Sequence, residues 1–219
     1  MNPPTAEEQL KFLMNIQRLL VEGQFTATYK YALLLALADI AVEIGDYLGG
    51  PVDVPTKLIA EKFIQYYWRQ CIPYLPRNNP TTGQVLKQNA GKQAAIVRQV
   101  IEARQEHGDS LVDAQLDQQG WAALVQRVNQ VVRQMPLWKL ETVGGSKFNF
   151  LYPNQGDSNS IELRPGVAYC LRQFHGLIGD LVRGAWVWKS TEQYLRPTEC
   201  AARFTDVHAY CELGVSADL

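Results

Sequence analysis

The 219-residue sequence lacks the short motifs that mark common catalytic and nucleotide-binding sites. It contains no GxSxG nucleophile motif, no GxxxxGK[ST] phosphate loop and no GxGxxG dinucleotide motif. Its three histidines stand in no HExxH or HxH arrangement. We therefore assign no catalytic residue and no metal ligand from the sequence alone, and we expect no cofactor bound by this chain.

Cysteine and long apolar runs are also scarce. The four cysteines include no CxxC pair, which argues against a zinc knuckle or a disulfide framework and fits a reducing compartment. The most apolar run, Tyr31–Val42, is interrupted by Asp39 and is shorter than the roughly 18–20 residues of a spanning helix. The N-terminus is acidic where a signal peptide needs a basic start. The sequence thus predicts a cytoplasmic protein without a membrane segment.

Positive and negative residues are nearly equal in number. The chain has 21 Lys and Arg against 22 Asp and Glu. This balance excludes a protein that is basic over its whole surface and wraps nucleic acid, but it is compatible with one local basic face. The hydrophobic fraction of 47% is that of an ordinary globular protein and excludes a disordered chain.

Apolar residues at helical spacing predict a mainly α fold. The helix spanning 26–48 is apolar almost all round, which is typical of a central helix covered on several sides. Pro55 suits the first turn of the helix that follows it. The expected helices span residues 6–22, 26–48, 56–71, 92–107, 119–135 and 165–188, with a short helical or turn segment at 109–117.

Between the last two long helices the pattern changes to short strands at 138–142, 147–152 and 160–163. We therefore predict a mainly α fold with a small β-hairpin or three-stranded element. The expected organisation is an N-terminal helical subdomain (1–75), a loop (76–91), a winged-helix-like helical subdomain with a β-hairpin (92–189) and an irregular tail (190–219).

A basic set in the second half carries the first functional hypothesis. In a winged-helix arrangement, a hairpin and a helix approach the phosphate backbone of DNA, where cations give salt-sensitive affinity. The alternative is that the strands only cap the helical core and the cations only solubilise the surface. The candidate nucleic-acid-binding residues are Arg127, Arg133, Lys139, Lys147, Arg164 and Arg172.

Two other readings stay open. The aromatic residues Tyr66, Tyr67 and Trp68 exceed what one helix needs for a core, which suggests a protein–protein or oligomerisation module. His208 and Cys211 are spaced as HxxC, with Cys200 nearby, so a zinc-dependent enzyme is a third hypothesis. His175 is expected to be a structural or surface histidine.

Several segments in order carry a family resemblance: TATYKYALLLALADIAVE, VPTKLIAEKFIQYYWRQ, VLKQNAGKQAAI, LWKLETVGGSKFNFLY and IELRPGVAYCLRQFHGLIGDLVRGAWV. Over residues 22–188 the chain resembles the N-terminal region of bacterial HNH endonuclease-domain proteins, a group linked to defence or mobile elements. In that family a nuclease with an Asp-His pair and a divalent metal follows this region. After Trp188 this sequence has no Asp-His pair, so no catalytic residue is carried over.

The resemblance implies a non-catalytic DNA-binding or nuclease-positioning domain. The expected partners are duplex DNA, a nuclease partner or a second copy of the chain, and no membrane. The sequence after Trp188 does not resemble the corresponding part of the family. This is expected of a truncated or frameshifted gene product, of a deliberately shortened protein, or of a natural stand-alone form.

Overall fold

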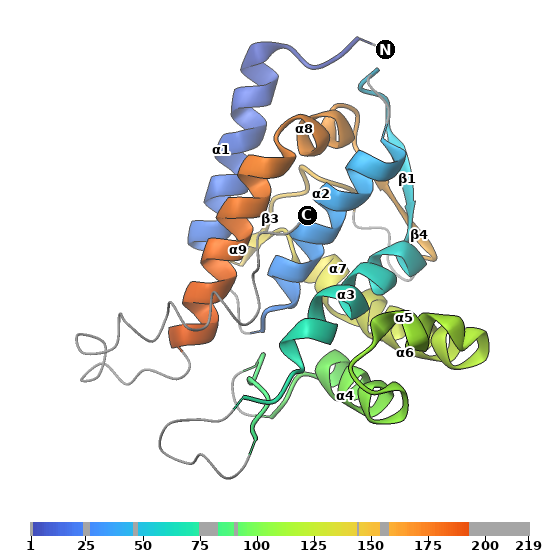
Figure 1. Ribbon diagram of the computed structural model, residues 1–219. Helices are drawn as coiled ribbons and strands as arrows, with labels where there is room; N and C mark the ends of the chain where they lie inside the picture. Colours follow the sequence, from blue (N-terminus) through green and yellow to red (C-terminus); the bar gives the residue numbers. More distant parts are fainter. Residues whose placement is uncertain are drawn as a thin grey trace.

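The chain folds around helix α2 (Tyr29–Ile44), which is buried on almost every side. The computed structural model describes residues 2–23, 27–45, 48–74, 83–89, 92–143, 145–153 and 158–192. Helices α3, α7, α8 and α9 pack around α2, as Figure 1 shows. The surrounding helices remove the all-apolar surface of α2 from water, so the prediction of a mainly α fold with a central second helix is confirmed.

Helix α1 (Ala6–Glu22) lies at one edge of the molecule beside helix α9 (His175–Glu192) (Figure 1). Thr5 and Glu8 form a capping box that satisfies amides at the start of α1. Phe12 and Ile16 face the core, while the opposite side of α1 is exposed. The predicted helix over 6–22 is confirmed.

Helix α3 (Thr56–Gln70) follows Pro55 as predicted and forms the layer behind α2. Tyr67 and Trp68 are buried in the core. The Tyr67 hydroxyl lies 2.7 Å from the hydroxyl of Thr28, the residue before α2. The prediction that the α3 aromatics exceed the needs of a core is therefore wrong. Helix α3 packs against α2 on one side and against α4 and α6 on the other, and its aromatic rings lie in these interfaces.

The outer layer consists of α4 (Ala95–His107), α5 (Leu111–Leu116) and α6 (Gln118–Gln134), and α7 (Pro136–Lys139) leads from α6 back to α2. Helices α4 and α6 pack on the far side of α3. The predicted helices over 92–107 and 119–135 are confirmed with small shifts at their ends. The strand predicted over 138–142 is wrong for most of its length, because Pro136 begins a helical turn there.

The described strands form two separate two-stranded sheets. Strand β1 (Val52–Pro55) pairs antiparallel with β4 (Ser160–Leu163), whereas β2 (Thr142–Val143) pairs with β3 (Ser146–Lys147) as a short hairpin. A small β-hairpin is therefore present, as predicted, but the strand predicted over 147–152 is wrong beyond Lys147, and the described strands form no three-stranded sheet. The structure does not support the winged-helix-like half, because β4 pairs with a strand more than 100 residues before it.

Two helices occupy the segment predicted as one helix over 165–188. Helix α8 (Val167–Gln173) ends at Phe174, whose φ of −107° and ψ of 22° depart from helical values, and α9 begins at His175. The bend lets α8 and α9 both pack on α2. Residues 1–75 and 92–189, which the sequence divides at the loop 76–91, contribute to one hydrophobic core. No helix among the described residues is long and apolar enough to cross a membrane.

Candidate functional site

The six predicted basic residues do not form one surface. Arg172 on α8 donates to the carbonyl oxygens of Val42 (2.9 Å) and Gly45 (3.0 Å), so it satisfies the C-terminal end of α2. Arg133 donates to the side-chain oxygen of Asn159 at 2.9 Å. Helix α8 lies at the top of Figure 1 and α6 at the lower right, so the predicted set is divided between distant elements.

Arg127 and Arg164 are exposed. Arg164 lies near the buried Glu141, whose pKa is raised by burial against the opposing effects of nearby backbone N–H groups and the Arg164 charge. The Glu141 carboxylate accepts from the Leu151 amide at 2.8 Å, which anchors the segment after the hairpin.

Lys30, Lys139 and Lys147 each lie near Thr142, on three different elements. Lys30 at the start of α2 donates from Nζ to the Thr142 carbonyl oxygen at 3.3 Å. Thr142 is the direct cross-strand partner of Lys147, so the two side chains share one face of the hairpin. Lys139 ends α7, three residues before Thr142. We name Lys30, Lys139, Lys147 and the adjacent Trp138 the hairpin–α7 cluster.

Lys30 is unusual for a cation because only 7% of its surface is exposed. Burial, followed by the nearby charge of Lys139, lowers the pKa of Lys30 to about 8. The cluster therefore concentrates positive charge beside the hairpin, which is the field that an anion requires.

An aromatic side chain accompanies the cations. Trp138 is 43% exposed, and Lys139 Nζ lies 4.9 Å from the centre of its ring. Just after β3, the half-buried Phe148 ring has Arg18 4.5 Å from its centre. Exposed rings beside lysines are suited to stacking on bases or on other flat groups.

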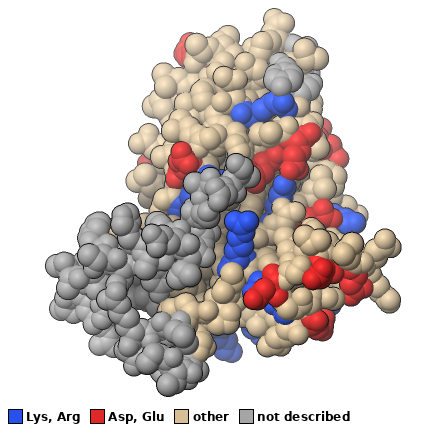
Figure 2. Space-filling model, in the orientation of Figure 1, with Lys and Arg blue, Asp and Glu red and all other residues tan. Residues whose placement is uncertain are grey.

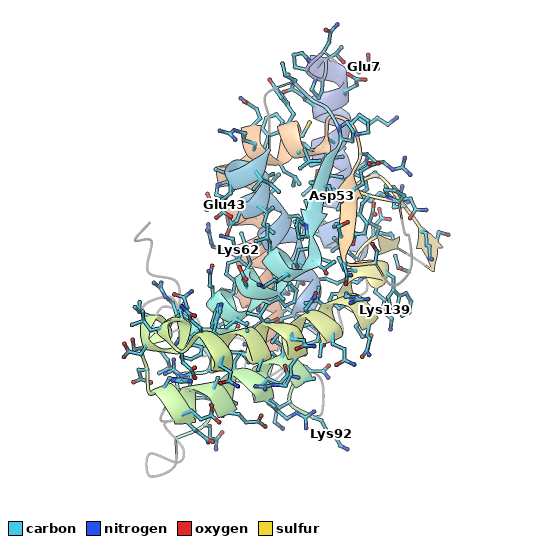
Figure 3. All side chains as sticks on the ribbon, turned by 90° about the vertical axis from the view of Figure 1, so that its right-hand side faces the viewer. Glu7, Glu43, Asp53, Lys62, Lys92 and Lys139 are labelled. Carbon is cyan, nitrogen blue, oxygen red and sulfur yellow. The ribbon has the colours of Figure 1, made fainter. Side chains whose placement is uncertain are left out.

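The charges on the rest of the surface are mixed. On the face shown in Figure 2, Lys and Arg side chains alternate with Asp and Glu, and the described residues there form no broad basic area. In Figure 3, Lys139 lies where the long α6–α7 row ends, whereas Lys62 and Glu43 point toward each other elsewhere, with a 2.5 Å ion pair. The positive charge of the hairpin–α7 cluster is thus a local feature.

A second polar cluster lies between α2, α3 and α9. Asp39 Oδ1 lies 2.7 Å from His175 Nε2, and the Tyr66 hydroxyl donates to Asp39 Oδ2 at 2.5 Å. Burial raises the pKa of Tyr66 well above its usual value, and the Asp39 charge adds to this effect. Because these groups satisfy one another, we treat the Asp39 network as a structural link between three helices.

The described residues offer no metal centre. They contain no group of three or more His, Cys, Asp or Glu side chains that could hold an ion. The candidate ligands Cys200, His208 and Cys211 lie outside the described residues. Burial raises the pKa of Cys71 to about 12 and that of Cys170 to about 11, so neither is a reactive thiolate near neutral pH.

Sequence reasoning missed Lys30, although one signal was present. Lys30 is the only cation in the apolar stretch that forms α2, and a lysine in a helix with no polar face has to find a polar partner. That partner is the Thr142 carbonyl, 112 residues away in the chain, which local spacing does not reveal.

The comparisons with known proteins place the chain in a family. A family model described as a domain of unknown function, DUF8808, matches residues 8–205. The chain belongs to the DUF8808 family. No curated protein and no solved structure matches this DUF8808 chain. The description of the family names no activity, so the resemblance to HNH endonuclease-domain proteins stays a prediction.

Proposed function

We propose that this DUF8808 chain is a non-catalytic module that binds nucleic-acid phosphates at the hairpin–α7 cluster and thereby positions a nuclease partner. The observation that carries the proposal is the convergence of three lysines from α2, α7 and β3 around Thr142. Folding brings like charges together there against their mutual repulsion, and phosphate groups would relieve that repulsion.

The proposal revises the residue set expected from the sequence. Lys139 and Lys147 remain in it, and Lys30 is added. Arg133 and Arg172 have hydrogen-bond partners within the protein, so we assign them to the fold. Arg127 and Arg164 stay predictions, because they are exposed on elements outside the cluster. The nuclease-positioning part depends on the family resemblance alone.

The test is binding of the full chain to a labelled DNA duplex, measured by fluorescence anisotropy across a salt series. Contact of the two exposed lysines, Lys139 and Lys147, with phosphates predicts a slope of log K against log salt of about −1.8. Charge reversal of Lys139 and Lys147 together (Lys139→Glu, Lys147→Glu) should weaken binding at least about tenfold at low salt.

The matched control is Lys92→Glu. Lys92 is exposed, and Figure 3 shows it at the bottom of the molecule, well separated from Lys139. This variant should bind within about twofold of the unmodified chain. Absence of binding at low salt, affinity that is insensitive to salt, or equal losses in the control and the double variant would overturn the proposal.

A further inference from the structure

The edge formed by α1 and α9 exposes large apolar side chains in two regular lines. On α1, Leu10, Met14 and Val21 are 60–76% exposed and lie opposite the face that packs into the core. On α9, Leu177, Leu181 and Trp188 are 43–66% exposed. The two helices lie side by side (Figure 1), so this edge, which we name the α1–α9 edge, contains two outward-facing apolar lines.

The spacing of the α9 line is typical of a helix that packs lengthwise against another helix. On α9 the exposed positions 177, 181, 184 and 188 are separated by four, three and four residues, whereas the line on α1 has the polar Gln17 between Met14 and Val21. Such a 4-3-4 pattern keeps one line of side chains facing a partner helix along its length.

Gly184 is the member of the α9 line that the fold does not explain. A Cβ at this position would meet nothing within 4 Å, and the backbone there is ordinary helix. Glycine is among the poorest residues for a helix interior, so neither local space nor backbone conformation favours it. A residue without a side chain does, however, allow a second helix to approach closely at that point.

We propose that the α1–α9 edge binds a second copy of this chain, with α9 antiparallel to its counterpart. A two-fold axis between residues 182 and 183 would place Leu181 of each chain over Gly184 of the other, and Leu177 beside Trp188. Each large side chain then meets a gap or a flat ring, which is the self-complementarity that a two-fold interface needs. This inference goes beyond the proposed phosphate binding and concerns a different surface.

The charges beside the α9 line and the size of the α1–α9 edge are consistent with a second copy of the chain as the partner. Asp180 and Arg183 lie on one flank of the α9 line, 3.6 Å apart within the chain, and the two-fold axis brings Asp180 of one copy within a turn of Arg183 of the other. Helices of 17 and 18 residues side by side present an edge about 27 Å long and about 20 Å wide. The accessible area of such a surface approaches the roughly 800 Å² per partner of stable interfaces.

Sedimentation equilibrium of the full chain, from about 1 μM to about 100 μM, tests the proposal. The unmodified chain should pass from monomer to dimer in this range. Replacing two members of the α9 line (Leu181→Gln with Trp188→Gln) should raise the dimer Kd at least about tenfold. Leu116→Gln is the matched control, because Leu116 is a 73% exposed leucine on α5, and it should change Kd less than about twofold.

A second variant separates association from folding. Gly184→Gln fills the space that Leu181 of the second copy would occupy while improving the helix, so it should weaken the dimer without lowering the thermal midpoint. A chain that stays monomeric throughout the concentration range would overturn the proposal. So would a dimer whose Kd is unchanged by the α9 variants, or one that the Leu116 control weakens equally.

Discussion

Helix α2 carries two polar clusters built on opposite electrostatic principles. In the Asp39 network a carboxylate meets a phenol and an imidazole, and each polar atom that faces the cluster has a partner. In the hairpin–α7 cluster, burial and then the charge of Lys139 disfavour the charged form of Lys30 and lower its pKa. The first arrangement lowers the free energy of the fold, and the second raises it.

The contrast separates a structural site from the proposed binding site. Groups that satisfy one another have little left to offer a ligand, whereas gathered like charges favour an anion that enters from outside. If this distinction holds, substitutions in the Asp39 network should affect stability and leave phosphate binding alone. Substitutions in the hairpin–α7 cluster should weaken phosphate binding without destabilising the fold.

The largest loss of stability is expected from Asp39→Ala. This variant removes the acceptor of the buried Tyr66 hydroxyl and of His175, and should lower the free energy of unfolding by about 2 kcal/mol. Urea denaturation followed by circular dichroism measures the change. Asp39→Asn, which keeps an acceptor for Tyr66, should lose less than Asp39→Ala; equal losses would show that these hydrogen bonds do not stabilise the link.

Removing the buried cation Lys30 should raise the free energy of unfolding instead of lowering it. Lys30→Met fills the same space without a charge, so at pH 7 it should raise the free energy of unfolding by about 1–2 kcal/mol. The same variant should weaken DNA binding. A variant that is stabilised and still binds as tightly as the unmodified chain would remove Lys30 from the binding site.

The pH dependence of the Lys30→Met effect follows from the lowered pKa of Lys30. Between pH 8 and 10.5 the unfolded chain still holds the Lys30 proton while the folded chain has released it, so rising pH stabilises the unmodified chain relative to the variant. The advantage of Lys30→Met should therefore shrink across this window. Measuring the difference between the two proteins cancels the contributions of the buried tyrosines and cysteines.

A smaller effect is expected from Tyr66→Phe. The substitution removes one hydrogen bond to Asp39 and leaves the ring in place, so the loss in the free energy of unfolding should be about 1 kcal/mol. Chemical denaturation of Tyr66→Phe, Asp39→Ala and the double variant forms a cycle. If the two losses simply add, the hydrogen bond between these residues contributes nothing.

The smallest change in stability is expected from Lys147→Ala. Lys147 is exposed at the hairpin, so the free energy of unfolding should change by less than about 0.5 kcal/mol. The slope of log K against log salt for DNA binding should nevertheless become shallower by about 0.9, because one phosphate contact is lost. An unchanged slope would exclude Lys147 from the interface.

Helix positions were predictable because their signals are local. The capping box at Thr5 and Glu8 and the proline before α3 both lie within a few residues of the helix start that they determine. The strand predicted over 138–142 is wrong for most of its length because short apolar segments are ambiguous, and Pro136 favours a helical turn there. The break at Phe174 depends on the packing of α8 and α9 against α2, for which the sequence contains no local signal.

The candidate site was only half predictable. Lys139 and Lys147 lie eight residues apart, and their proximity follows from a short hairpin. Lys30 joins them through a contact across 112 residues, and Arg172 leaves the predicted set because it contacts the end of α2 across 127 and 130 residues. Composition identifies cations, but only the tertiary fold decides which of them face a ligand.

The burial of α2 has a consequence for synthesis on the ribosome. Helix α2 ends at Ile44, yet α8 and α9, which cover it, begin only at Val167 and His175. At translation rates of about 5–20 residues per second, the most apolar helix of the nascent chain waits on the order of 10 s for its cover. During that interval it is a natural target for chaperones that bind exposed apolar segments, and slower translation would lengthen the exposure.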